Sequence, residues 1–206
     1  MEAQRSTYTY TPLDNAQREI RLLHILPKYS SLPRTAKLRS EEDIDTVGCF
    51  FSPTTLQDPS DFEALSYVWG DASNKKIIRL QGHDFPVTEN LHQALVHLRE
   101  DYKERICWID ALCINQGDLD ERASQVSQME HIYRQAKEVI VFLGPYWKGQ
   151  QVALDFMFAI ASDKNLHYSP LQEPHFTSNG GLDASSELLC SYLARFFALP
   201  WWTRAW

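Results

Sequence analysis

The sequence lacks the motifs that mark the commonest nucleotide and hydrolase sites. It contains no GxGxxG, no GxxxxGK[ST] and no GxSxG. The chain therefore offers no Rossmann or P-loop phosphate site and no nucleophile elbow of an α/β-hydrolase. Basic residues are also scarce, because 20 Lys and Arg stand against 27 Asp and Glu, for a net charge of −7. Phosphate backbones bind clustered Lys and Arg, so we exclude nucleic acid as the main partner.

Cysteine pairs and long apolar runs are missing as well. The four cysteines, at positions 49, 107, 113 and 190, form no CxxC pair and have no histidine at zinc-ligand spacing. We therefore expect no metal site and a reduced intracellular chain. No apolar run approaches the roughly 18 residues of a membrane-spanning helix, and the N-terminus has no signal-peptide core. These absences predict a cytoplasmic domain without a membrane span.

The most informative stretch that is present is ICWIDALCINQ, at Ile106–Gln116. A short apolar run bounded by polar turn residues is typical of a buried strand in an α/β sheet, so we predict a strand over 106–114. Helical spacing of apolar residues follows and predicts a helix over 122–137. A second buried strand is expected at Val139–Leu143. Together these elements make one strand–loop–helix–strand unit.

The helix over 122–137 carries specific expectations about its N-terminus and its buried face. Asp118 or Asp120 can cap it, and Glu121 suits the first turn of the helix dipole. The inward positions predicted from the spacing are Val126, Met129, Ile132, Tyr133 and Ala136.

Outside this unit, the sequence predicts mainly strands on the N-terminal side and helices on the C-terminal side. Strands are expected at 19–26, 47–51 and 62–69, with a hairpin at 77–80 and 85–87. Helices are expected at 88–99, with Thr88 as its cap, at 152–161, and from Ser185 or Ser186 onward, beyond a loop at 163–183. Residues 1–18 form a polar segment that we expect to be frayed, although Tyr8, Tyr10 and Leu13 have the apolar surface to dock. Strand–helix alternation across 62–160 predicts an α/β fold with a flavodoxin-like core of parallel central strands. N-terminal strands or a hairpin and C-terminal helices elaborate this core.

Asp110 stands inside the predicted strand, where an uncompensated charge would cost several kcal/mol. One interpretation is structural: backbone N–H groups or an arginine satisfy the carboxylate, which then organises the following loop. The other is a pocket carboxylate at the carboxyl end of a strand, where α/β sheets place ligands. We predict a pocket at this edge that also holds Ser66, Tyr67, Trp69, Asn115, Gln116, Glu121 and Arg122. A nucleophilic role for Cys113 is the less favoured alternative, because buried thiols are usually inert.

Several short sequence motifs occur in an order that resembles the HET domain of fungal heterokaryon-incompatibility proteins. They are ALSYVWG (64–70), NLHQAL (90–95), WIDALCINQ (108–116), VIVFLG (139–144) and WWTRAW (201–206). The resemblance runs from about Tyr8 to the C-terminal residue, although family members generally continue past the WWTRAW motif. It implies a single HET-like domain over 19–206, truncated at its C-terminal end. It also implies a cell-death effector in non-self recognition that acts by self-association or with partner death domains.

The order of strands and helices is also distantly similar to a TIR domain, some members of which cleave NAD. The TIR resemblance implies a glutamate on the helix after Gly144-Pro145, but the only carboxylate near that place is Asp155. Cleavage of the glycosidic C–N bond needs a carboxylate against the developing oxocarbenium ion. The alternative function is therefore an NAD glycohydrolase, with NAD as substrate rather than cofactor and with Asp110, Glu121 or Asp155 as catalytic residues.

Overall fold

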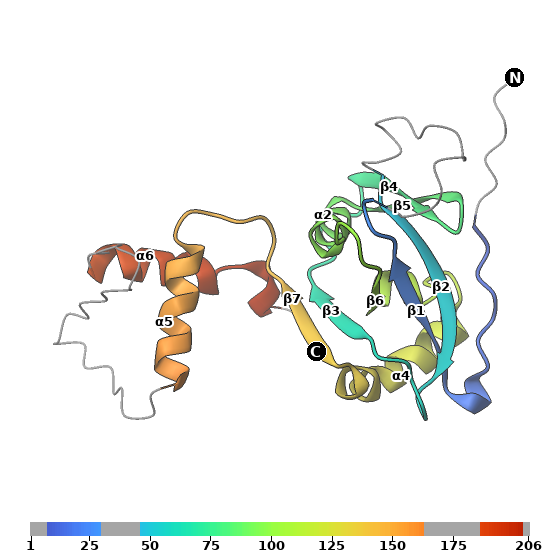
Figure 1. Ribbon diagram of the computed structural model, residues 1–206. Coiled ribbons are helices and arrows are strands. Elements are labelled where there is room, and N and C mark those ends of the chain that lie inside the picture. Colours follow the sequence, from blue (N-terminus) through green and yellow to red (C-terminus); the bar gives the residue numbers. More distant parts are fainter. Residues whose placement is uncertain (1–7, 30–45, 163–185, 204–206) are drawn as a thin grey trace, which may run out of the picture. The chain divides into compact units, whose positions relative to one another are not determined.

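The computed structural model describes residues 8–29, 46–162 and 186–203 (Figure 1). Contacts within the chain divide it into two compact units, Met1–Gly144 and Pro145–Trp206. The first unit contains the sheet, and the second contains the two C-terminal α-helices of the described chain. The single domain expected over 19–206 stays a prediction.

A seven-stranded mixed sheet forms the centre of the first unit (Figure 1). Its strands are β1 (Glu19–Ile25), β2 (Gly48–Thr55), β3 (Glu63–Tyr67), β4 (Lys75–Leu80), β5 (His83–Thr88), β6 (Arg105–Trp108) and β7 (Glu138–Phe142). Across the sheet they lie in the order β5-β4-β2-β1-β6-β3-β7. Helices accompany this sheet, so the predicted α/β class is confirmed.

Three parallel strands form the core that the sequence predicted. β3 lies between β6 and β7 and pairs with both in parallel, so that Ala64 stands opposite Trp108 on one side and Val139 on the other. Taken in chain order, the three strands follow the start of the flavodoxin-like doubly wound order. Beyond β6 the pattern changes, because β1 pairs with β6 antiparallel. β1, β2 and the β4–β5 hairpin therefore extend the parallel core as an elaboration.

The strand predicted over 106–114 is wrong in its second half. β6 ends at Trp108, and Asp110–Cys113 form the short helix α3. The N–H of Cys113 donates to the carbonyl of Ile109 at 2.8 Å, so this segment satisfies its backbone locally rather than in the sheet. Periodicity does not distinguish a buried strand from a buried helical turn in so short an apolar run. Asp110 consequently begins a helix instead of standing inside a strand.

Helix α2 (Glu89–Leu98) forms as predicted. The Leu91 N–H donates to the Thr88 hydroxyl at 3.3 Å, which caps the first turn. The buried face of the helix consists of Leu91, Ala94, Leu95 and Leu98. The helix contacts both strands of the β4–β5 hairpin.

Helix α4 (Leu119–Gln135) is capped by Asp118, whose carboxylate accepts the N–H groups of Asp120 and Glu121 at 3.0 Å each. The predicted inward position of Val126 is wrong, because that side chain is 53% exposed. The other predicted inward residues, Met129, Ile132, Tyr133 and Ala136, pack against the core. The buried stripe also contains Glu121, Gln125 and Gln128. A pattern of apolar residues alone misses such a polar stripe.

Strand β7 was predicted to be buried, and this is wrong for one of its faces. Val139 is 47% exposed and Val141 is 41% exposed. The cause is position, because β7 is the last strand of the sheet in the described part of the chain. Ile140 and Phe142 lie on the other face and pack against the core. β7 is therefore an edge strand with two exposed valines.

The N-terminal segment docks on the sheet from Tyr8 onward. The Tyr8 ring lies 5.9 Å from the Phe51 ring and 6.2 Å from the Phe85 ring. The Tyr10 hydroxyl donates to the carbonyl of Leu112 at 2.9 Å. A 3-10 turn, η1 (Asn15–Gln17), then leads into β1. The expected fraying is therefore wrong from Tyr8 onward, and the alternative, in which the two tyrosines dock, is confirmed.

The second unit contains α5 (Gln150–Ser162), α6 (Ser186–Phe197) and the 3-10 turn η2 (Pro200–Thr203). Trp147 is buried in it, with the Arg195 guanidinium 4.6 Å from its ring and the Tyr192 ring at 6.1 Å. The predicted C-terminal helices are confirmed, and the loop expected at 163–183 lies outside the described residues. Among the helices in the described ranges, none has the length and apolar character needed to cross a membrane.

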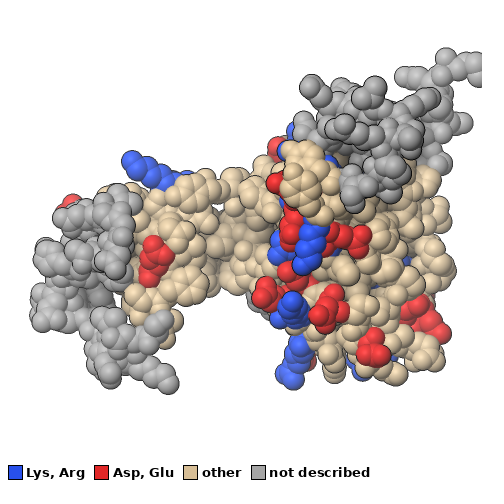
Figure 2. Space-filling model, viewed as in Figure 1, with Lys and Arg blue, Asp and Glu red and all other residues tan. Residues whose placement is uncertain are grey.

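Charges of both signs are mixed on the surface of the first unit. Figure 2 shows Lys and Arg interspersed with Asp and Glu on its visible face. One such exposed pair joins Arg134 to Glu130 on α4 at 2.7 Å. Mixed signs weaken the summed field of such a face.

Gly149 tests the packing of the second unit. Its φ is +95°, and an added Cβ would lie 2.4 Å from the Tyr192 ring. We expect Gly149→Ala to lower the free energy of unfolding by about 2–4 kcal/mol, from left-handed backbone strain and overpacking together. Gly82, with φ +84° and open space around it, is the matched control. Urea unfolding should show a loss of only about 1–2 kcal/mol for Gly82→Ala. Equal losses in the two variants would contradict the close packing of Gly149 on Tyr192.

Candidate functional site

A cavity of about 380 Å³ lies where β3 and β6 end. This is the edge at which open α/β sheets bind ligands. Four of the predicted ligand-binding residues line it, namely Tyr67, Trp69, Asn115 and Gln116. The other walls come from Tyr10, the β4–β5 hairpin, the first turn of α2 and the residues of α3. The structure therefore brings half of the predicted site together.

Asp110 does not line this cavity, but it is hydrogen-bonded to two residues that do, Trp69 and Gln116. Its Oδ2 accepts a hydrogen bond from Trp69 Nε1 at 3.0 Å, and its Oδ1 accepts the Ala111 N–H at 2.8 Å. The Gln116 side-chain amide donates to the backbone carbonyl of Asp110 at 2.9 Å. Asp110 is only 5% exposed, so these partners replace the water that the carboxylate loses. Their arrangement orients Trp69 and Gln116, which both line the cavity.

Glu121 does not line the cavity, contrary to the prediction. Its carboxylate forms a bidentate ion pair with Arg21 of β1, with N···O distances of 2.5 and 2.8 Å. The backbone N–H of Asn115 donates to the same carboxylate at 2.7 Å. Arg21 is 3% exposed and Glu121 is 7% exposed. Glu121 therefore joins α4 to β1 and fixes the loop at Asn115.

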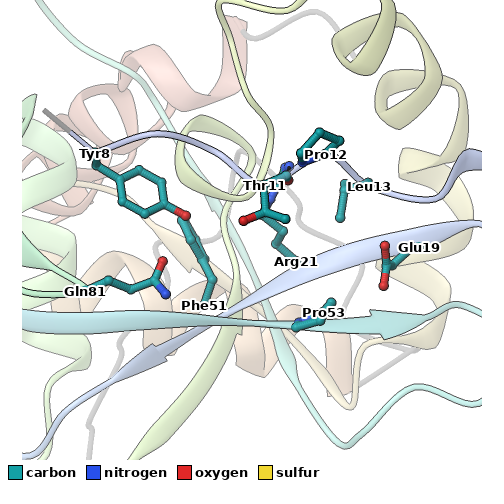
Figure 3. Close-up of a pocket in the computed structure, with 9 residues that line it drawn as sticks. All are labelled: Tyr8, Thr11, Pro12, Leu13, Glu19, Arg21, Phe51, Pro53 and Gln81. Carbon is teal, nitrogen blue, oxygen red and sulfur yellow. Dashed lines mark hydrogen bonds between the residues drawn. The ribbon is translucent and has the colours of Figure 1, made fainter.

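Arg21 has further partners besides Glu121. Its Nη1 donates to the carbonyl of Cys113 at 3.1 Å, and its Nη2 donates to the carbonyl of Thr11. The Tyr10 ring lies over the guanidinium, 5.0 Å from Cζ to the ring centroid. Figure 3 shows Arg21 close to Thr11 at a second cavity, of about 280 Å³. Burial raises the pKa of the Tyr10 phenol above its usual range, so this hydroxyl stays a neutral donor.

Sequence reasoning missed Arg21 as part of this arrangement. The residue interrupts the apolar run of EIRLLHIL, and a charge at a buried strand position needs an opposite charge or several hydrogen bonds. That interruption was the available signal. The partner is 100 residues away in the chain, and no local pattern identifies it.

Three other predicted site residues lie away from the cavity. Ser66 precedes Tyr67 in β3 and therefore points to the opposite face of the sheet. Arg122 follows Glu121 in α4, turns away from it by about 100°, and is exposed. Asp155 is an exposed residue of α5 in the second unit, where it accepts a hydrogen bond from the Gln151 side chain at 2.8 Å. Among the described residues, no group of three or more His, Cys, Asp or Glu is placed to hold a metal ion.

Three of the four cysteines are buried and carry no activated thiol. Burial raises the pKa of Cys49 and of Cys107 to about 12. Burial also raises the pKa of Cys113 well above its usual range, although the Ile109 N–H, which donates to its sulfur, opposes this. A raised pKa leaves little thiolate near neutral pH, and thiolate is the nucleophile. The geometry thus disfavours a nucleophilic Cys113.

Thiol alkylation tests this burial. We expect iodoacetamide at mildly alkaline pH to modify Cys190, which is exposed, and to leave the other three cysteines unmodified in the folded chain. Mass spectrometry of tryptic peptides gives the site. After unfolding in urea, all four should react, which serves as the control. Rapid alkylation of Cys113 in the folded chain would contradict its burial.

The buried ion pair predicts a specific pattern of stabilities. Arg21→Met leaves Glu121 buried without its partner, and we expect a loss of about 3–5 kcal/mol in the free energy of unfolding. Arg21→Met/Glu121→Leu removes both charges, so its loss should be smaller than the sum of the two single losses. The control is Arg134→Met, which breaks the exposed pair with Glu130 and should cost under about 1 kcal/mol. Similar losses for Arg21→Met and Arg134→Met would contradict the structural role of the buried pair.

Comparisons with known proteins identify a family for this chain. The family model described as heterokaryon incompatibility protein (HET) matches residues 62–206. The chain is 37% identical over 114 residues to heterokaryon incompatibility protein 6, OR allele, of Neurospora crassa. That match covers 49% of this chain and 17% of the relative, so the chain spans a small part of that protein. No solved structure matches the chain. Because the family match covers well over half of its residues, the chain belongs to the heterokaryon incompatibility (HET) protein family.

Proposed function

We propose that this chain is a cytoplasmic cell-death effector domain of fungal heterokaryon incompatibility that acts through self-association. Membership of the HET family and the similarity to a Neurospora crassa protein named for heterokaryon incompatibility support this role. The competing hypothesis is a TIR-like NAD glycohydrolase, which would kill by cleaving NAD. The two differ in whether a carboxylate is available for chemistry.

The predicted catalytic carboxylates are engaged elsewhere. Both oxygens of Glu121 pair with Arg21, and both oxygens of Asp110 accept hydrogen bonds from Trp69 and Ala111. Asp155 lies on an exposed helix surface and is bonded to its neighbour one turn away. A glycosidase-type reaction needs a carboxylate that is placed against the sugar and able to change its bonding. These engagements support signalling without catalysis.

The observation that carries self-association is the difference between the two edges of the sheet. At one edge, β5 contains Asp84 and Pro86, residue types that protect an edge from further strand pairing. At the other edge, β7 has the sequence EVIVF and two exposed valines, with no proline or glycine. Its outer backbone groups have no strand partner in the described part of the chain. An apolar, unprotected edge strand is a template for pairing with another chain.

The sequence of β7 suits pairing with a second copy of itself. In an antiparallel pair centred on Ile140, Val139 of one copy stands opposite Val141 of the other. The same register places Glu138 opposite Phe142, so the two glutamates do not meet. A two-fold arrangement of this kind uses one patch on both copies and closes on itself. We therefore propose β7 as the self-association surface.

Charge on this edge should abolish both association and toxicity. We expect Val139→Lys/Val141→Lys to stay monomeric at concentrations where the unmodified chain dimerises, because the two lysines would face each other across the interface. Val126→Lys, at an exposed valine of α4, is the matched control and should change neither property. Light scattering over a concentration series measures association, and viability after expression in a fungus measures toxicity.

The outcomes separate the possible partners. Loss of toxicity with an unchanged oligomeric state would point to a partner domain at β7 and would contradict self-association there. A monomeric double variant that is still fully toxic would show that association is not needed for killing. Urea unfolding of each variant checks that it is folded.

A further inference from the structure

The cavity at the ends of β3 and β6 has walls that suit a flat ring. Its lining includes the aromatic residues Tyr10, Trp69 and Phe85, together with Tyr67, which is buried. Its volume of about 380 Å³ lies within the roughly 300–1,000 Å³ range of small-molecule pockets, toward the small end. Aromatic side chains bind planar ligands by stacking and edge contacts, and this contribution is large for each ring. A ligand of one or two rings matches this space.

The polar groups at the cavity are few and of defined kinds. Asn115 Oδ1 accepts the Gly117 N–H at 3.2 Å, which leaves its amide N–H₂ group as a donor at the cavity. Gln116 uses its amide N–H₂ group on the carbonyl of Asp110, which leaves its amide oxygen as an acceptor. The two amides therefore offer one donor and one acceptor to the edge of a ring.

The charge at the cavity is positive, although the chain as a whole is acidic. Lys75 is the one charged residue in the lining, and no carboxylate is among the described residues that line it. The next residue, Lys76, lies 4.0 Å from Glu89 and does not line the cavity. Asp110 does not line the cavity, and its carboxylate accepts hydrogen bonds from Trp69 Nε1 and the Ala111 N–H. An anionic group on a ligand would thus meet Lys75 without a competing carboxylate in the lining.

We propose that this cavity binds a flat aromatic ring that carries one anionic group. The ring lies against the aromatic walls, the two amides contact its polar edge, and Lys75 pairs with the anion. Trp69 is the principal wall, since its orientation is fixed by Asp110 while 44% of it is exposed. The same chemistry is found in aromatic carboxylic acids and in nucleoside monophosphates, which are two distinct sources of ligand.

Calorimetric titration with two matched pairs of probes tests the proposal. The first pair is indole-3-acetate and indole-3-acetamide, and the second is adenosine monophosphate and adenosine. In at least one pair, the anionic member should bind up to about fivefold more tightly than the neutral one, the upper end of what an exposed ion pair contributes. The pair whose anionic member binds more tightly than its neutral member shows whether the ligand is an aromatic carboxylic acid or a nucleoside monophosphate.

Variants with matched controls assign the two contacts. Lys75→Gln should remove the preference for the anionic probe, whereas Lys76→Gln, next to it in β4, should leave the preference unchanged. Trp69→Leu should weaken binding about tenfold or more, whereas Trp69→Phe keeps a flat ring and should retain most of it. Because Trp69→Phe also removes the donor to Asp110, retained binding would assign the effect to stacking rather than to that hydrogen bond.

Three results would overturn the proposal. Absence of binding by all four probes, equal binding of charged and neutral members in both pairs, or indifference to Lys75→Gln would each contradict it. The proposal is independent of self-association, so the Val139→Lys/Val141→Lys variant should bind the probes as the unmodified chain does. If this variant still binds the probes but is no longer toxic, ligand binding at the cavity and self-association at β7 are independent properties.

Discussion

The first unit depends on one buried ion pair, between Arg21 and Glu121. A buried pair loses so much hydration that it is tolerated only when further hydrogen bonds satisfy both groups. Here the guanidinium also donates to the carbonyls of Thr11 and Cys113, and the carboxylate also accepts the Asn115 N–H. One contact thus holds the N-terminal segment, β1, the end of α3 and the start of α4 in a single arrangement.

This pair shapes the candidate site without belonging to it. Glu121 fixes Asn115, which lines the cavity, and Asp110 fixes Trp69 and Gln116, which line it as well. The carboxylates therefore position the walls, while aromatic residues, amides and Lys75 line the cavity. Such a division explains how a polar, acidic loop after a parallel strand can have the residue types of a catalytic site and yet hold the walls of a cavity in place.

The parts of the fold that were predictable are those set by local patterns. Apolar runs and turn residues gave the parallel core around β3, and single side chains at the right offset gave the caps Thr88 and Asp118. The helical turn at Asp110 was missed because a short apolar run has the same appearance in a strand and in a buried turn. The partner of Glu121 and the exposed position of β7 were missed because each depends on where distant segments lie. At the cavity, Tyr67, Trp69, Asn115 and Gln116 line the walls, and their position at strand ends was visible in the sequence. Ser66 and Arg122 lie elsewhere because successive side chains point in different directions in a strand and in a helix.

The central claim is that this HET domain signals without carboxylate chemistry. The most direct measurement is the release of nicotinamide from NAD by the purified chain, followed by chromatography at concentrations where the chain associates. Our account predicts no release above that of a buffer control, because Glu121 and Asp110 are committed to Arg21, Trp69 and backbone N–H groups. Sustained release that grows with protein concentration would contradict the account and would assign these carboxylates, or Asp155, a catalytic role.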